Sequence, residues 1–223
     1  MIPKDESHKS DLDDLIDELL KHFDEKDAAR EESLRRSRIV IRLSSTAIRA
    51  THRRERSEAE VRLKEAREHL SEIKDLLRDH QDVRYSGFVD DAEQEFVEAS
   101  VLYSLIFEGR MPTHQDLDVD PVSYLSGLGD LTGELRRSIL ELIRNGRPED
   151  GEVLLEIMEE IYHMLMRFDY PEAIMRGLRR KTDLARSMIE RTRGDITNAI
   201  QIQSLERHLA LLEDKLKGSY SDL

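Results

Sequence analysis

The segment DPVSYLSGLGDLTGELRRSILELIRNG, residues 120–146, predicts a helix with a defined start and a defined end. Asp120 suits the N-cap position, and Pro121 suits the first turn, where a backbone N–H is not needed. Asn145 and Gly146 are typical of a C-terminal stop. Each glycine inside such a helix destabilises it by up to about 1 kcal/mol relative to alanine, so we expect a very close neighbouring helix. The glycines in question are Gly127, Gly129 and Gly133.

Similar helix signals recur along most of the chain and predict an all-α protein. Glu, Leu, Arg and Ala are abundant, apolar residues repeat at helical spacing, and strand-like alternation is nearly absent. Pro148, Pro171 and Gly194 stand at short connections, so the helices that they join are expected to be antiparallel. Two longer connections, 79–89 and 109–120, have room for irregular structure. The predicted helices span residues 10–55, with room for a bend at 24–26, and 57–80, 89–108, 121–145, 149–168, 171–193 and 196–217.

Composition indicates a single helical domain and excludes several kinds of site. Of 223 residues, 38% are hydrophobic and 37% charged, which suits a protein with a core and a solvated surface. No apolar run reaches the roughly 18 residues of a membrane span, and no signal-peptide core is present, so we expect no membrane partner and a cytoplasmic location. The chain has no cysteine, which excludes disulfides, thiolate zinc sites and cysteine nucleophiles. We expect residues 1–9 to be a flexible N-terminus, 10–217 one domain and 218–223 a C-terminal tail.

Positive charge is concentrated in the first long helix, although the whole chain is acidic. The net charge is -13, yet residues 30–56 contain nine Arg and three Glu. At about 100° per residue, six of these arginines fall within an arc of about 60°. Because each guanidinium can donate two hydrogen bonds to a phosphate, the pattern predicts a nucleic-acid-binding surface. A solvated face that pairs with neighbouring carboxylates is the alternative. We name the arginine row by its members: Arg35, Arg38, Arg42, Arg49, Arg53 and Arg56.

Two pairs of carboxylates interrupt apolar helix faces. Glu95 and Glu98 are one turn apart on a face that continues with Leu102, and Asp130 and Glu134 share a face of the glycine-containing helix. Partly buried carboxylates repel one another unless they are protonated, hydrogen-bonded or neutralised by a cation. If the two helices are neighbours, these four side chains form an all-oxygen ligand set suited to Mg²⁺ or Mn²⁺. Polar seams of a helical bundle are the alternative. We name Glu95, Glu98, Asp130 and Glu134 the acid cluster.

His52 lies off the arginine row on the same predicted helix. A lone histidine on a helix is more often structural than catalytic, so the sequence gives it no functional role.

Two stretches, QEFVEA at residues 94–99 and PVSYLSGLGDLTGELRR at 121–137, resemble the translin and Trax family. The second stretch is the more specific. The motif DAAR at residues 27–30, Arg84-Tyr85, Tyr170-Pro171 and Arg193-Gly194 follow in similar order, so the resemblance covers nearly the whole chain. It implies a seven-helix, translin-like right-handed helical bundle. It also implies assembly into a closed oligomeric shell, an octamer in this family, that binds single-stranded RNA or DNA on its interior surface.

The resemblance also implies roles for particular residues. Trax subunits cleave RNA with acidic residues and Mg²⁺, and those acids resemble Glu95, Glu98, Asp130 and Glu134 here. Arg84, in a loop that matches the family, joins the arginine row in the expected nucleic-acid-binding set. The chain lacks the long loops of eukaryotic Trax, which suits an archaeal-type member built from one kind of subunit.

Three functions are compatible with these features. The first is a Mg²⁺- or Mn²⁺-dependent endoribonuclease that acts on single-stranded RNA inside a homo-octamer. The second is a non-catalytic shell that binds single-stranded RNA or DNA. An all-helical nucleotide pyrophosphohydrolase would explain the acid cluster but gives no use for the arginine row.

Overall fold

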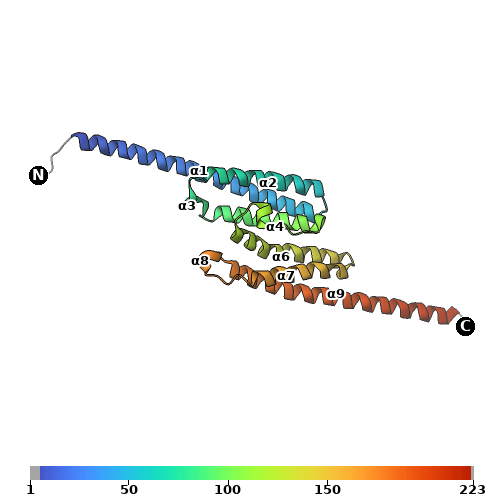
Figure 1. Ribbon diagram of the computed structural model, residues 1–223. Coiled ribbons are helices and arrows are strands. Elements are labelled where there is room, and N and C mark those ends of the chain that lie inside the picture. The colour runs from blue at the N-terminus through green and yellow to red at the C-terminus, as the bar shows by residue number, and fades with distance from the viewer. Residues whose placement is uncertain (1–5, 222–223) are drawn as a thin grey trace.

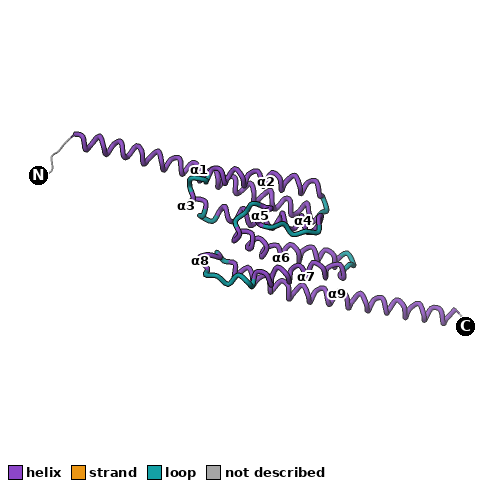
Figure 2. Tube along the Cα trace, viewed as in Figure 1, coloured by secondary structure: helices purple, strands orange, loops and turns teal. Residues whose placement is uncertain are grey.

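The computed structural model describes residues 6–221, which form helices joined by loops and contain no strand (Figure 2). The all-α prediction is therefore confirmed. Six long helices make up most of the described part: α1 (Glu6–His52), α2 (Arg56–Leu76), α4 (Phe88–Glu108), α6 (Pro121–Arg144), α7 (Gly151–Leu165) and α9 (Leu178–Ser221). Short helical turns lie between them: α3 (Gln81–Arg84), α5 (His114–Leu117), a 3₁₀ turn (Pro148–Asp150) and α8 (Glu172–Met175).

The helices form two layers whose long axes run in similar directions (Figure 1). One layer contains α1, α2 and α4, and the other contains α6, α7 and α9. The layers meet where α4 packs against α6, and the largest core side chains, among them Phe96, Leu102, Leu128 and Leu135, are fully buried around this contact. The N-terminal part of α1 and the C-terminal part of α9 extend beyond the bundle at opposite ends (Figure 1).

The long connection between α4 and α6 makes these two helices parallel. It returns along α4, so that Glu93 Oε2 accepts a hydrogen bond from the backbone N–H of Asp120 at 3.2 Å. The Tyr124 hydroxyl donates to the carbonyl oxygen of Pro112 at 2.8 Å and fixes the same connection. Both helices thus begin at the same end of the bundle, and this places the predicted carboxylate pairs of α4 and α6 at similar heights.

The predicted boundaries of α6 are confirmed. The Asp120 side chain accepts hydrogen bonds from the backbone N–H of Val122 at 2.9 Å and of Ser123 at 3.4 Å, and Pro121 occupies the first turn. The helix ends at Arg144, after which Gly146 adopts a φ of +72°, a backbone conformation that favours glycine.

Helix boundaries near the C-terminus differ from the prediction. The predicted stop at Gly194 is wrong, because α9 continues through it and the helix is held on both sides by buried Thr192 and Ile196. The helix predicted to begin at residue 171 begins at Leu178 instead. Arg176 and Gly177 have φ values of +44° and +88°, which interrupt the helix and separate the single turn α8 from α9.

The first helix also differs from the prediction. It runs without a break through residues 24–26, begins at Glu6 within the stretch assigned to the N-terminal segment, and ends at His52. Arg54, with a φ of +62°, turns the chain into α2. Residues 1–5 and 222–223 of the predicted terminal segments lie outside the described residues. Within the described part, every helix is too short or too polar to cross a membrane.

Candidate nucleic-acid interface and acid cluster

The glycines of α6 allow it to approach two helices closely, as the sequence predicts. A Cβ atom on Gly127 would lie 2.8 Å from the Cβ of Val97 on α4. A Cβ atom on Gly129 would lie 3.0 Å from the Cβ of Lys181 on α9, and one on Gly133 would lie 3.7 Å from Met188 Sδ. Gly127 therefore sets the contact with α4, and the other two glycines face α9.

The close contact brings the two predicted carboxylate pairs together. Burial raises the pKa of Glu98 to about 8, and the negative charges of Glu95, Asp130 and Glu134 contribute to the same rise. The pKa of Glu95 is also raised, first by burial and then by Asp130. Lys181 also bridges Gln94, the neighbour of Glu95, and Asp130, so the acid cluster lies at one contact between α4 and α6.

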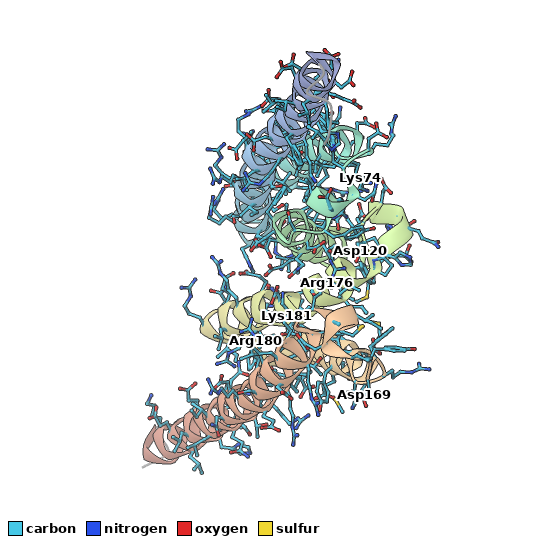
Figure 3. The ribbon with its side chains drawn as sticks, turned by 90° about the vertical axis from the view of Figure 1, so that its left-hand side faces the viewer. Lys74, Asp120, Asp169, Arg176, Arg180 and Lys181 are labelled. Atoms are coloured by element: carbon cyan, nitrogen blue, oxygen red, sulfur yellow. The ribbon has the colours of Figure 1, made fainter. Side chains whose placement is uncertain are left out.

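Three cationic or ionisable side chains contact this group: Lys181, His52 and Arg137, whose Nη1 lies 3.6 Å from Glu134 Oε2. Lys181 Nζ donates hydrogen bonds to Asp130 Oδ2 at 2.5 Å and to Gln94 Oε1 at 2.6 Å. His52 Nε2 lies 2.5 Å from Glu134 Oε2, and this contact is the main reason that the pKa of Glu134 is lowered. Figure 3 shows Lys181 between α9 and the helices above it. The carboxylates outnumber the positive charges beside them.

His52 and Lys181 are functional candidates that the sequence did not reveal. The His52 side chain is buried, and its Nδ1 lies 3.4 Å from Ser138 Oγ. Each residue meets its partner carboxylate from a different helix, across 82 positions for His52 and 51 for Lys181. A spacing rule within one helix cannot find such a contact.

The acid cluster has the donor chemistry of a hard-cation site. Its polar atoms are all carboxyl oxygens, the type of ligand that Mg²⁺ and Mn²⁺ prefer. In the conformation described for residues 6–221, no three or more His, Asp and Glu side chains are arranged as metal ligands. Asp130 and Glu134 are instead engaged by Lys181 and His52.

The arginine row lies on the solvent side of α1, opposite the face that carries buried Ser33, Ser37, Val40, Ser44 and Ala47. Arg35 donates two hydrogen bonds to Glu32 at 2.7 Å, and Arg53 donates to Glu55 at 2.6 Å. Arg38, Arg42 and Arg49 are exposed, and no carboxylate of the described side chains forms an ion pair with them. The alternative of a fully paired surface therefore holds for only part of the row.

Two members of the row do not belong to α1, because that helix ends at His52. Arg53 lies in the turn, and Arg56 begins α2, where its Nε donates to the Tyr103 hydroxyl at 3.3 Å. The prediction that one helix carries all six arginines is therefore wrong for these two.

The C-terminal end of the arginine row lies close in the chain to His52, which contacts the acid cluster. Arg49 lies one turn before His52 on α1, Arg53 follows His52 directly, and His52 contacts Glu134.

Arg84 has a different environment. Its side chain is 12% exposed and donates hydrogen bonds to Glu93 Oε1 at 2.8 Å and to Asp90 Oδ1 at 3.3 Å. Glu93 is fully buried, so its charge requires this partner. Arg176 closes the same network by pairing with Asp90 and with Asp120, beside which it lies in Figure 3. We correct the expectation for Arg84: its guanidinium joins helices through a buried ion pair and is not part of the exposed row.

Comparisons with known proteins give consistent results. The sequence model described as the Translin family matches residues 28–193. An uncharacterized protein of Methanocaldococcus jannaschii is 35% identical over 198 residues, which cover 88% of this chain and 87% of that protein.

Solved structures are similar over most of the chain. AfC3PO in a complex with duplex RNA has a TM-score of 0.78 and 37% identity, and the match covers 84% of this chain and 97% of that one. Apo-NeC3PO has a TM-score of 0.70 and 27% identity, with 89% and 98% covered.

Proposed function

Because the chain belongs to the translin family, we propose that it binds RNA along the arginine row and cleaves it with a divalent cation at the acid cluster. The observation that carries this proposal is that carboxyl groups of α4 and α6 flank one close helix contact, and that Glu134 pairs with His52, which lies next to Arg53 in the chain. AfC3PO, a structural relative, has been solved with duplex RNA, which supports RNA as the class of ligand.

The exposed arginines would hold the RNA backbone. From Arg35 to Arg49 the row covers about 20 Å of helix, at about 1.5 Å per residue, which is enough to contact several phosphates. Arg38, Arg42 and Arg49 contribute most, because Arg35 and Arg53 already pair with Glu32 and Glu55. Single-stranded RNA is the proposed substrate, and single-stranded DNA would use the same contacts with phosphates.

The acid cluster would hold Mg²⁺ or Mn²⁺ through the carboxylates of Glu95, Glu98, Asp130 and Glu134. When bound, such a cation acidifies a water ligand and offsets negative charge on the phosphodiester oxygens. His52 orients Glu134 by contacting its Oε2, and the neighbouring Ser138 fixes the other side of the imidazole ring. The buried apolar contacts of α4 and α6 keep the carboxylates of the two helices at a fixed separation.

We further propose that copies of this chain form the closed shell, an octamer, that is typical of the family. The extended parts of α1 and α9 carry apolar side chains that are 47–59% exposed on α1 and 51–59% exposed on α9. On each helix they recur at spacings of three and four residues, as in helices that pack against a partner. We name them the apolar arms: Leu12, Leu15, Ile16, Leu19, Leu20 and Phe23 on α1, and Ile202, Leu205, Leu209 and Leu212 on α9.

A second candidate function is RNA binding without cleavage. One observation favours it: Asp130 and Glu134 are paired with Lys181 and His52, so the described residues 6–221 contain no ready three-ligand metal arrangement. In that case the acid cluster is a polar seam between α4, α6 and α9.

A cleavage assay separates the two candidates. End-labelled RNA is incubated with the full chain in Mg²⁺, Mn²⁺ or EDTA, as a single strand and as a duplex of the same sequence. We expect shortened products from the single strand with Mg²⁺ or Mn²⁺ and none with EDTA. RNA that is retained by the protein but never shortened would establish the non-catalytic alternative.

Two substitutions test the site assignment. Glu95→Gln and Glu134→Gln should each lower the cleavage rate by about 100-fold or more and leave RNA affinity equal or higher, since negative charge near the RNA falls. Glu156→Gln is the matched control, because Glu156 is exposed on α7 and has the same three-residue spacing to Glu159. Cleavage at the wild-type rate by either acid-cluster variant would refute the assignment.

A further inference from the structure

Lys181 occupies an unusual position for a lysine. It projects from α9 with its side chain only 13% exposed, and its ammonium reaches Gln94 on α4 and Asp130 on α6. Gly129 makes room for it, since a Cβ atom at that position would lie 3.0 Å from the Lys181 Cβ. Three helices and one glycine thus fix this positive charge beside the acid cluster.

The ammonium affects more than its direct partner. Its charge opposes the rise in the pKa values of Glu95 and Glu98 that burial and their acidic neighbours cause. His52 contacts the opposite end of the cluster at Glu134, so the fixed positive charge nearest Asp130 is that of Lys181. Arg137 and His52 contact Glu134, so without Lys181 it is Asp130 that would lose its ion-pair partner beside the carboxyl groups of Glu95 and Glu98.

We propose that Lys181 is a built-in counter-ion that stabilises the acid cluster in the metal-free protein and competes with a divalent cation for Asp130. The two positive groups repel one another and require the same carboxylate oxygens, so the cation must displace the ammonium. The competition rests on the metal site of the proposed function. The counter-ion role rests only on the contacts of Lys181 within the chain.

The test compares Lys181→Met with Arg180→Met in the full chain. Arg180 is the preceding residue of α9 and is exposed (Figure 3), so both variants lose one positive charge from one helical turn. In EDTA we expect Lys181→Met to lower the melting temperature clearly below that of Arg180→Met. In calorimetric titration with MnCl₂ without RNA, we expect Lys181→Met to bind about tenfold more tightly than wild type, since a repelling charge is gone. Arg180→Met should bind with wild-type affinity.

Two further variants keep the result decisive. Lys181→Arg retains the charge and should keep Mn²⁺ affinity near the wild-type value. Asp130→Asn removes the carboxylate that loses its partner in Lys181→Met, so it should restore much of the metal-free stability that Lys181→Met loses. If Lys181→Met alone does not fold, recovery of folding in the double variant tests the counter-ion role instead.

Each contrary result has a definite meaning. Equal melting temperatures for Lys181→Met and Arg180→Met in EDTA, or no rescue by Asp130→Asn, would overturn the counter-ion role. Unchanged or weaker Mn²⁺ binding by Lys181→Met would overturn the competition. If neither wild type nor Lys181→Met binds Mn²⁺, the metal site of the proposed function fails together with the competition, while the EDTA comparison still decides the counter-ion role.

Discussion

Gly127 packs directly against the backbone of Gln94: a Cβ atom at position 127 would lie 2.7 Å from the Gln94 carbonyl oxygen. Backbone atoms cannot rotate away as a side chain can, so this contact fixes the distance between α4 and α6. Asp130 and Glu134 follow Gly127 by about one and two turns of α6. The separation of the carboxylates in the acid cluster therefore depends on a glycine that carries no functional group.

Gly127→Ala should destabilise the protein by about 1–3 kcal/mol, because the added methyl group forces α4 and α6 apart. Gly194→Ala is a control for which we expect a change in stability of the opposite sign. Gly194 lies inside α9, and a Cβ atom there would have no neighbour within 4 Å, so alanine should stabilise the helix by about 0.4–1 kcal/mol. Urea unfolding of both variants measures the two changes. If Gly127→Ala leaves the free energy of unfolding unchanged, α4 and α6 can move apart without a loss of stability.

Local chemistry makes much of the fold predictable. Asp120 and Pro121 specify the start of α6, and the glycines of that helix report close packing before any partner is known. The same kind of reasoning wrongly predicts a helix end at Gly194, because the sequence does not distinguish a glycine at a helix end from a glycine inside a helix. Burial of Thr192 and Ile196 decides between them, and burial depends on the packing of α9 against other helices.

The acidic residues of the candidate site are predictable for the same reason, since each pair interrupts an apolar face of one helix. Contacts between segments that are distant in the sequence are not predictable in this way. The pairing of Arg84 with buried Glu93, and of Lys181 with Asp130, depends on how α3, α4, α6 and α9 meet. Exposed arginines and buried arginines look alike in sequence, so the sequence alone does not separate Arg84 from the arginine row.

The apolar arms should hold copies of the chain together. Leu205→Glu with Leu209→Glu places two charges on the exposed face of α9, and we expect the mass from light scattering to fall toward that of one chain. Val153→Glu is the control, because Val153 is 61% exposed on α7 and lies outside the arms. An unchanged mass for the α9 variant would exclude this arm from the subunit interface.

His69 predicts a pH dependence of stability away from the acid cluster. Burial lowers its pKa below the ordinary value of 6.5, and the guanidinium of Arg36, at 3.1 Å from His69 Nδ1, lowers it further. The unfolded chain therefore binds this proton more readily than the folded chain. The contribution of His69 to stability is complete above pH 6.5 and is lost as the pH falls through the folded pKa.

His69→Gln should flatten this dependence in urea unfolding at a series of pH values from about 4.5 to about 7.5. His163→Gln is the comparison variant, because His163 is exposed on α7, and it should follow the wild-type curve. The interpretation is wrong if the slope of the His69→Gln curve equals that of wild type.

The arginine row makes a graded prediction for RNA binding, because its members differ in their existing partners. Arg38→Glu with Arg42→Glu removes two exposed guanidiniums that no described carboxylate engages, whereas Arg35→Glu with Arg53→Glu removes two that already pair with Glu32 and Glu55. Both double variants change the net charge equally. For single-stranded RNA, each lost phosphate contact should reduce the slope of log affinity against log salt by about 0.7.

We therefore expect a slope reduced by about 1.4 for the Arg38 and Arg42 variant and a smaller reduction for the Arg35 and Arg53 variant, measured by fluorescence anisotropy between about 50 and about 300 mM salt. A general effect of net charge would change both slopes equally. Equal changes would thus argue against local phosphate contacts, and unchanged slopes in both variants would remove the row from the RNA surface. Only the graded result is explained by direct contact, since it follows the pairing of each guanidinium and not the total charge.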